Sequence, residues 1–187
     1  MYIGGNTCFV TINHPVQSRL TKNVCLFTHF YTNIASIHMD AIFGTGINGI
    51  YFGMNEKDIV GILGAPTKRH FNNDECLLYL EYYSISTKFK FDEDEDFKLT
   101  NIETSNKEAS IFYKKIIGRE KKEVVELLNS KGYTNFEWED YEYFDELYCD
   151  ELSLWITFEY DKVTGFEFFP FIDDNDDGFL WPALPQR

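Results

Sequence analysis

Two segments of the chain carry the apolar spacing of short amphipathic helices. In the first segment, Asn55 is a good N-cap, and Asp58 stands three residues later, where its carboxylate can accept a hydrogen bond from the capping amide. Gly64 and Pro66 end the segment, because proline cannot continue a helix. The pattern predicts a helix between Gly53 and Pro66. Its apolar stripe consists of Ile59, Val60, Ile62 and Leu63.

The same spacing returns 65 residues later. Gly118 opens the second segment and Gly132 closes it, as Gly53 and Gly64 do in the first. Its apolar positions are Val124, Val125, Leu127 and Leu128. We interpret the match of initiator, apolar quartet and terminator as the trace of a duplicated module, which is too long to be a solenoid repeat.

Alternating apolar and polar positions, which are typical of half-buried strands, follow each predicted helix. They occur at 76–83, 86–92 and 97–104 in the first half, and at 152–161 and 162–170 in the second. The hairpin of the first half contains "EDED", whereas that of the second has a tight turn at Asp161-Lys162. We therefore predict an α+β fold: two tandem helix-plus-antiparallel-sheet repeats that form one curved sheet with the helices on one face.

The composition changes sharply near Met39. Residues 1–39 contain no Asp or Glu and only two cations, Arg19 and Lys22. Either residues 1–38 are an N-terminal extension with a strand or two, or the working protein starts at Met39 and the upstream stretch is poorly ordered or a mis-called start. We predict a first repeat at 39–106, a second at 107–173 and a C-terminal tail at 174–187.

The first helical segment and its lead-in carry a family resemblance. The stretch "GINGIYFGMNEKDIVGILGAP" resembles the G-I-x-F-G-M-[ST]-x-x-[DE]-V-x-x-L-G-x-P opening of modules in β-lactamase inhibitor protein and in BamE/SmpA-type lipoproteins. Tandem copies also occur in small bacterial immunity and inhibitor proteins. Asn55 replaces the usual Ser or Thr, and in the second copy Arg119 follows the glycine and no proline closes the helix. The resemblance covers about 48–173, and it implies joined sheets whose concave face grips an enzyme.

Composition and charge narrow the function classes. The chain is 44% hydrophobic and 18% aromatic, which indicates a folded protein. Residues 40–187 carry 15 Lys and Arg against 31 Asp and Glu, a net charge of −16. Such a chain repels nucleic acid and anionic lipid and attracts basic partners.

Cellular context is predicted from three further patterns. The sequence shows no secretory signal and no lipidation signal, and no apolar run approaches the roughly 20 residues that span a bilayer. The cysteines are scattered and form no C-x-x-C pair, so we expect reduced thiols and a cytoplasmic location. They are Cys8, Cys25, Cys76 and Cys149.

Motifs that could indicate an enzyme or a ligand site fail their context tests. "GTGING", 44–49, has the dinucleotide glycine spacing but leads into a strand rather than a helix. "DDNDDG", Asp173 to Gly178, matches the first half of a calcium loop, but its twelfth position is Leu184. No histidine or nucleophile signature is present. We expect a non-enzyme without catalytic residues, cofactor or metal, and keep weak calcium binding as an alternative.

The stretch "WEDYEYFDELYCDEL", 138–152, interleaves aromatic and acidic residues. One interpretation is structural, because Tyr141, Phe144, Leu147 and Tyr148 have helical spacing and could pack. The other is a partner-binding surface, because aromatic side chains dominate protein–protein hot spots and neighbouring acids steer a cationic partner. We favour the second. The predicted binding residues are Trp138, Glu139, Asp140, Tyr141, Glu142, Tyr143, Phe144, Asp145, Glu146, Tyr148, Asp150 and Glu151.

Taken together, these patterns favour an immunity or inhibitor protein. We expect it to bind and occlude a cognate bacterial toxin, such as a basic nuclease domain, and to bind neither nucleic acid nor membrane. The alternatives from other classes are a BamE-like assembly or scaffold protein, a small enzyme and a calcium-binding module. The sequence does not define the oligomeric state.

Overall fold

The computed structural model describes residues 39–173 and 178–185. All of them belong to one unit, His38–Arg187. The predicted N-terminal extension 1–38, the centre of the acidic turn at 174–177 and the last two residues lie outside the described residues.

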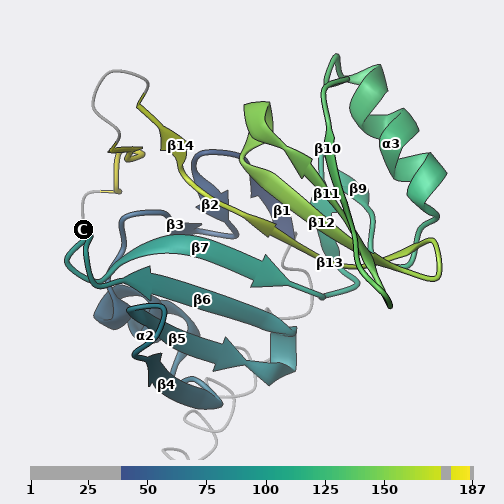
Figure 1. Cartoon of the computed structure of the whole chain (residues 1–187). Helices are drawn as coiled ribbons and strands as arrows, with labels where there is room; N and C mark the ends of the chain where they lie inside the picture. Colours follow the sequence, from purple (N-terminus) through teal and green to yellow (C-terminus); the bar gives the residue numbers. More distant parts are fainter. Residues whose placement is uncertain (1–38, 174–177, 186–187) are drawn as a thin grey trace, which may run out of the picture. The chain divides into compact units, whose positions relative to one another are not determined.

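An antiparallel sheet of eight strands dominates the described part of the chain (Figure 1). The strand order across this sheet is β10-β11-β12-β13-β7-β6-β5-β4. Two runs of four strands therefore meet where β13 pairs with β7, through Phe166 opposite Thr104, Glu167 opposite Glu103 and Phe168 opposite Ile102. The strands are β4 (Lys68–Asn72), β5 (Leu77–Tyr82), β6 (Thr87–Asp92), β7 (Lys98–Thr104), β10 (Glu137–Asp140), β11 (Asp145–Cys149), β12 (Leu154–Glu159) and β13 (Lys162–Phe168).

A second sheet has five short strands in the order β3-β2-β1-β8-β9, with β1 and β8 parallel. Residues 44–49, "GTGING", form the tight turns around β2 and lead into β3, so they precede a strand as predicted. At Gly46, φ is +145° and a Cβ atom would lie 2.0 Å from the carbonyl oxygen of Ile50, so only glycine fits. The strands are β1 (Met39–Ile42), β2 (Gly46–Ile47), β3 (Ile50–Tyr51), β8 (Ala109–Ile111) and β9 (Lys114–Lys115), and a separate pair is β14 (Phe171–Ile172) with β15 (Phe179–Leu180).

Both predicted helices are present, as α2 (Glu56–Leu63) and α3 (Lys121–Ser130). Asn55 caps α2 as predicted: its side chain accepts a hydrogen bond from the Asp58 amide, and the Asp58 carboxylate accepts one from the Asn55 amide. At the start of α3, the Glu123 carboxylate accepts a hydrogen bond from the Glu120 amide. Short 3₁₀ turns lie at Tyr83–Ile85 and Asp150–Leu152.

One face of the eight-stranded sheet lies in the core. Phe168 of β13 packs against Phe52 and Phe43, which flank the strands of the smaller sheet, at ring-centroid distances of 5.4 and 6.1 Å. The alternation of strands sends the neighbouring side chains to the opposite face. We call this second face the open face. From β11 across to β6, its central row is Tyr148, Trp155, Glu167, Glu103 and Lys88.

The predicted α+β class with tandem helix-plus-sheet repeats is wrong. The described chain is mainly β: sheets of eight, five and two strands stand against two α-helices of 8 and 10 residues. The helices contribute little to the core, since α2 buries only Ile59 and α3 only Val124 and Leu128. The prediction also expected a single sheet and missed the two- and three-residue strands, which are too short to show any periodicity.

Candidate functional site

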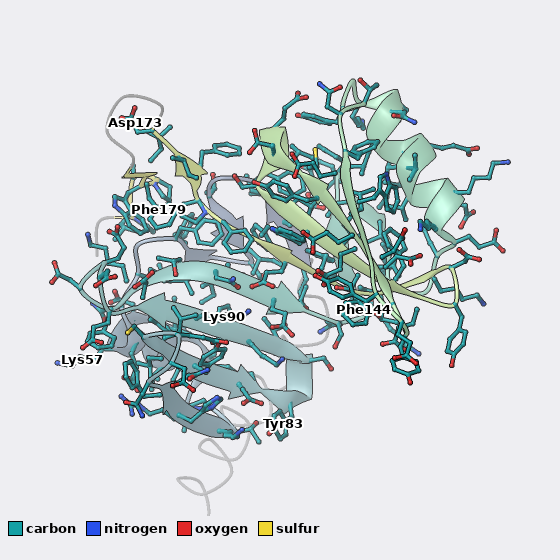
Figure 2. The ribbon with its side chains drawn as sticks, in the orientation of Figure 1. Lys57, Tyr83, Lys90, Phe144, Asp173 and Phe179 are labelled. Atoms are coloured by element: carbon teal, nitrogen blue, oxygen red, sulfur yellow. The ribbon has the colours of Figure 1, made fainter. Side chains whose placement is uncertain are left out.

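The stretch chosen from the sequence forms two strands and their turn at one end of the eight-stranded sheet. Strand β10 is the edge strand, and β11 pairs with it from Glu137 opposite Tyr148 to Asp140 opposite Asp145. The helical interpretation of Tyr141, Phe144, Leu147 and Tyr148 is therefore wrong. We call residues 137–151 the acidic edge. Figure 2 shows Phe144 at the tip of this hairpin.

The carboxylates of the acidic edge are almost all without a cation. Within the described residues, only Asp145 forms an ion pair, 2.7 Å from the Lys121 ammonium of α3. The reason is visible in the chain itself, because residues 132–161 contain ten Asp and Glu and no Lys or Arg. This segment supplies all of β10, β11 and β12.

Carboxylates near the centre of the sheet, by contrast, are paired with lysines of β6. On the open face, the Lys90 ammonium lies 2.5 Å from Glu167 and 3.3 Å from Glu103, and Lys88 lies 2.6 Å from Glu103. Burial alone would lower the pKa of Lys90, but the charges and hydrogen bonds of Glu167 and Glu103 outweigh it and raise the pKa. Burial would raise the pKa of Glu103, but its lysine partners hold it below its ordinary value. Figure 2 labels Lys90 on this sheet.

Glu146 shows the cost of missing cations. It stands directly opposite Glu139 in the β10–β11 ladder, so two like charges face each other across neighbouring strands. Burial raises the pKa of Glu146; a hydrogen bond from the Thr157 hydroxyl opposes this shift, and the charges of Glu139 and Glu167 add to it. Glu146 also lines a hollow of about 410 Å³ in which four glutamates converge: Glu103, Glu146, Glu159 and Glu167.

Aromatic side chains of the acidic edge reach the surface rather than the core. The exposed fraction is 40% for Trp138, 47% for Tyr141 and 76% for Tyr143. Tyr141 and Phe144 stack with ring centroids 4.5 Å apart, which stiffens the turn between the strands. The Lys121 ammonium lies 4.3 Å from the Trp138 ring centroid, and this contact fixes the indole from the α3 side.

Tyr148 lies on the open face and stacks on Trp155 of β12, with ring centroids 4.7 Å apart. Burial raises the pKa of Tyr148 to about 12, helped by the hydrogen bond that its hydroxyl donates to Asp150. The two stacked rings give a partner a rigid aromatic platform beside the unpaired carboxylates.

Sequence reasoning missed three residues that the fold adds to this surface. Trp155 joins it by stacking on Tyr148, and Glu137 begins β10. Tyr160 is 94% exposed and lies in the β12–β13 turn, which Tyr160 and Asp161 make with positive φ, one residue before the predicted turn. Strand register places this turn at the same end of the sheet as residues 141–144. Strict alternation along 152–161 could have indicated Trp155, because it puts that side chain opposite the core-facing set.

The described residues give no support for a metal site or a membrane-spanning helix. Among residues 39–173 and 178–185, no group of three or more His, Cys, Asp or Glu side chains could hold a metal ion. The calcium-like turn Asp173–Gly178 lies mostly outside the described residues. No helix of the described part is long and apolar enough to span a membrane.

Comparison with known proteins identifies no family. No family model and no curated protein matches this chain. Among solved structures, a 1.5 Å crystal structure of an extracellular protein containing a SCP domain from Bacillus anthracis str. Ames aligns with a TM-score of 0.41 at 9% sequence identity. The alignment covers 72% of this chain but only 50% of that one, so this chain spans about half of that protein. Likeness at this level carries no argument about fold or function.

Proposed function

We propose that this chain is an inhibitor of the immunity type, which binds a basic bacterial toxin through the acidic edge and blocks its working surface. One observation carries the proposal: a segment with ten carboxylates and no cation forms an outer edge of the sheet and also exposes several aromatic rings. By contrast, Glu103 on β7 and Glu167 on β13 of the same sheet are paired with lysines of β6.

Unpaired carboxylates at this density oppose folding, because like charges on neighbouring strands repel each other. A basic partner removes this repulsion when it binds. The same field attracts the partner from a distance, so we expect association on the order of 10⁸ M⁻¹s⁻¹ at low salt. Exposed Tyr141, Tyr143 and Tyr160 then supply the contact area that short-range affinity requires.

Occlusion follows from the chemistry of the surface. If the toxin is a nuclease, its cleft binds phosphates with Lys and Arg side chains. Carboxylates of the acidic edge can occupy the positions of those phosphates, so the inhibitor competes with substrate without any catalytic step. The stacked Tyr148–Trp155 pair beside them is already ordered, so less side-chain entropy is lost on binding.

The test is coexpression of the full chain with the toxin domain encoded beside its gene, scored by cell survival and by inhibition of the purified toxin. The decisive variant is Glu139→Gln/Glu142→Gln/Glu146→Gln. The matched control is Glu93→Gln/Asp94→Asn/Glu95→Gln in the β6–β7 turn, which changes the net charge equally. We expect the first variant to slow association at least roughly tenfold and the second to change it little.

Three results would contradict the proposal. They are absence of protection by the wild-type chain, equal effects of the two triple variants, and an association rate that is indifferent to ionic strength. The last one matters because screened charges at the surface must lose their steering effect as salt rises.

A further inference from the structure

Along its outer edge, β10 has backbone N–H and C=O groups with no hydrogen-bonded neighbouring strand in the described part of the chain. Strand β10 ends the eight-stranded sheet, and all four of its residues are exposed. Edge strands are usually protected by charged side chains, above all lysine, or by proline or a bulge. Strand β10 reads Glu-Trp-Glu-Asp and has no lysine, proline or bulge. Its three carboxylates discourage pairing with another acidic strand but not with a basic one. At the opposite end of the sheet, β4 carries Lys68 and Arg69, and both are held in ion pairs with Glu81 and Glu56.

The direction of the free backbone groups follows from the β10–β11 turn. The Tyr141 amide donates a hydrogen bond to the Phe144 carbonyl, so it points toward β11. Amides alternate along an antiparallel strand. Glu139 therefore also points its amide toward β11, whereas Trp138 and Asp140 point theirs outward. The edge offers two residues with both N–H and C=O available to another strand.

The side chains of β10 define what kind of strand fits. Glu137 and Glu139 share the open face with Tyr148 and Glu146, their partners in the ladder. Trp138 points to the other face, where its indole is 40% exposed beside Lys121. A strand laid along this edge would place alternate side chains beside two glutamates and the others beside an indole.

We propose that the basic partner adds an extended segment to β10 as a ninth, antiparallel strand, with Lys or Arg beside Glu137 and Glu139 and an apolar side chain over Trp138. This inference rests on the proposed function, because it describes how the same partner is held. Main-chain hydrogen bonds supply affinity in this mode, and the alternation of side chains supplies specificity.

A second copy of this chain fits the edge less well. Two β10 strands side by side would bring like carboxylates together, which is unfavourable directly across a ladder. The β4 edge of a second copy is basic, but Lys68 and Arg69 are already paired within their own molecule. Charge complementarity therefore favours a foreign basic strand.

The test uses a capped, labelled peptide that alternates Lys with Val or Ile, titrated with the full chain at low salt by fluorescence anisotropy. Two N-methylated versions keep every side chain. In an antiparallel addition, the Val and Ile amides face β10 and the Lys amides face away. We expect methylation of the Val and Ile amides to weaken binding roughly tenfold or more and methylation of the Lys amides to have little effect. Equal weakening by both patterns would overturn strand addition.

A variant of the chain gives an independent readout. Asp140→Pro removes an outward amide without touching the bonds to β11, and Asp140→Asn removes only the charge. We expect the proline variant to bind the unmethylated peptide at least roughly fivefold more weakly than the asparagine variant. Circular dichroism checks that the proline variant is folded, and the methylated peptides decide the matter on the wild-type chain if it is not.

The two proposals fail in different ways. If neither peptide pattern shows the expected difference while the wild-type chain still protects cells from the toxin, strand addition is wrong and the inhibitor function stands. If the methylation pattern appears as expected and no protection is seen, the inhibitor function is wrong and β10 still accepts basic strands. Appearance of a dimer that excludes the peptide would show that a second copy occupies the edge, and it would overturn the inference.

Discussion

Replacing Glu146 by Gln is expected to stabilise the free protein, which is unusual for a change in a half-buried side chain. Glu146 faces Glu139 across the ladder and has no ion-pair partner among the described residues. Gln keeps an oxygen that can accept the Thr157 hydrogen bond and removes the charge. The matched change is Glu103→Gln on the same face, where the carboxylate holds Lys88 and Lys90.

The magnitude follows from the geometry. Directly opposed side chains lie about 5 Å apart at Cβ, and two unit charges at about 6 Å repel by roughly 0.7–1.4 kcal/mol at an effective dielectric constant between about 40 and 80. Screening by solvent at this half-exposed site reduces the gain to about 0.5–1 kcal/mol. For a folded unit of this size we expect the melting temperature to rise by roughly 1–3 °C. Glu103→Gln should instead cost about 1–2 kcal/mol, because it weakens two charge-assisted hydrogen bonds.

The assay is urea denaturation of the three proteins, followed by tryptophan fluorescence at neutral pH and again in acid. The folded-state pKa of Glu146 is raised, so its ionised form opposes folding above that pKa, and the penalty disappears as pH falls to the unfolded value. The folded-state pKa of Glu103 is lowered, so its contribution is present above the unfolded pKa and is lost as pH falls through the folded one. A loss of stability in Glu146→Gln at neutral pH, or a gain that persists unchanged in acid, would refute the reasoning.

Three other predictions concern the cation network, a helix cap and the exposed rings. Lys90→Met should lower the free energy of unfolding by about 2 kcal/mol, because it leaves two half-buried carboxylates without their shared cation. Lys88→Met should lower it by less than about 1 kcal/mol. Urea denaturation measures both losses, and equal losses would contradict the network. Asn55→Ala should cost about 1 kcal/mol and Asn55→Asp little, because only the first removes the cap of α2; thermal unfolding measures this, and a loss in both would contradict it. Tyr143→Ser and Tyr160→Ser should each change the free energy of unfolding by less than about 0.5 kcal/mol. Each should speed dissociation of the toxin roughly fivefold, as measured by surface plasmon resonance. An unchanged dissociation rate would show that these rings are not part of the interface.

The sequence was most informative about features that depend only on neighbouring residues, such as helix caps and periodic apolar positions. Capping residues and an apolar stripe located both helices, because caps and 3.6-residue periodicity are local properties. Strand β12 alternates strictly because one of its faces is buried, whereas the alternation of β13 breaks at Thr164 and Gly165, where its register with β12 shifts. The fold class was wrong because helix caps and helical periodicity are easier to recognise in a sequence than short or exposed strands. Strands such as β1, β4 and β10 were therefore not predicted.

The sequence indicated that the acidic edge is exposed, but it did not predict that these residues form two β-strands. An edge strand with every residue exposed has no buried set, so no two-residue period separates it from a helix. Tyr160 and Trp155 lie outside the chosen stretch, and only strand register brings them to it. Register depends on pairing between strands, which a single sequence does not display.

The cation-free segment also has a consequence for diffusion. It follows residues 107–131, which carry seven Lys and Arg against four Asp and Glu and end in α3. A segment with a net charge of +3 beside a strongly acidic segment contributes to an electric dipole moment of the folded body. In the field of a cationic surface such a body experiences a torque, and it rotates its negative pole forward before the two molecules touch. A larger share of random collisions then begins in the productive orientation.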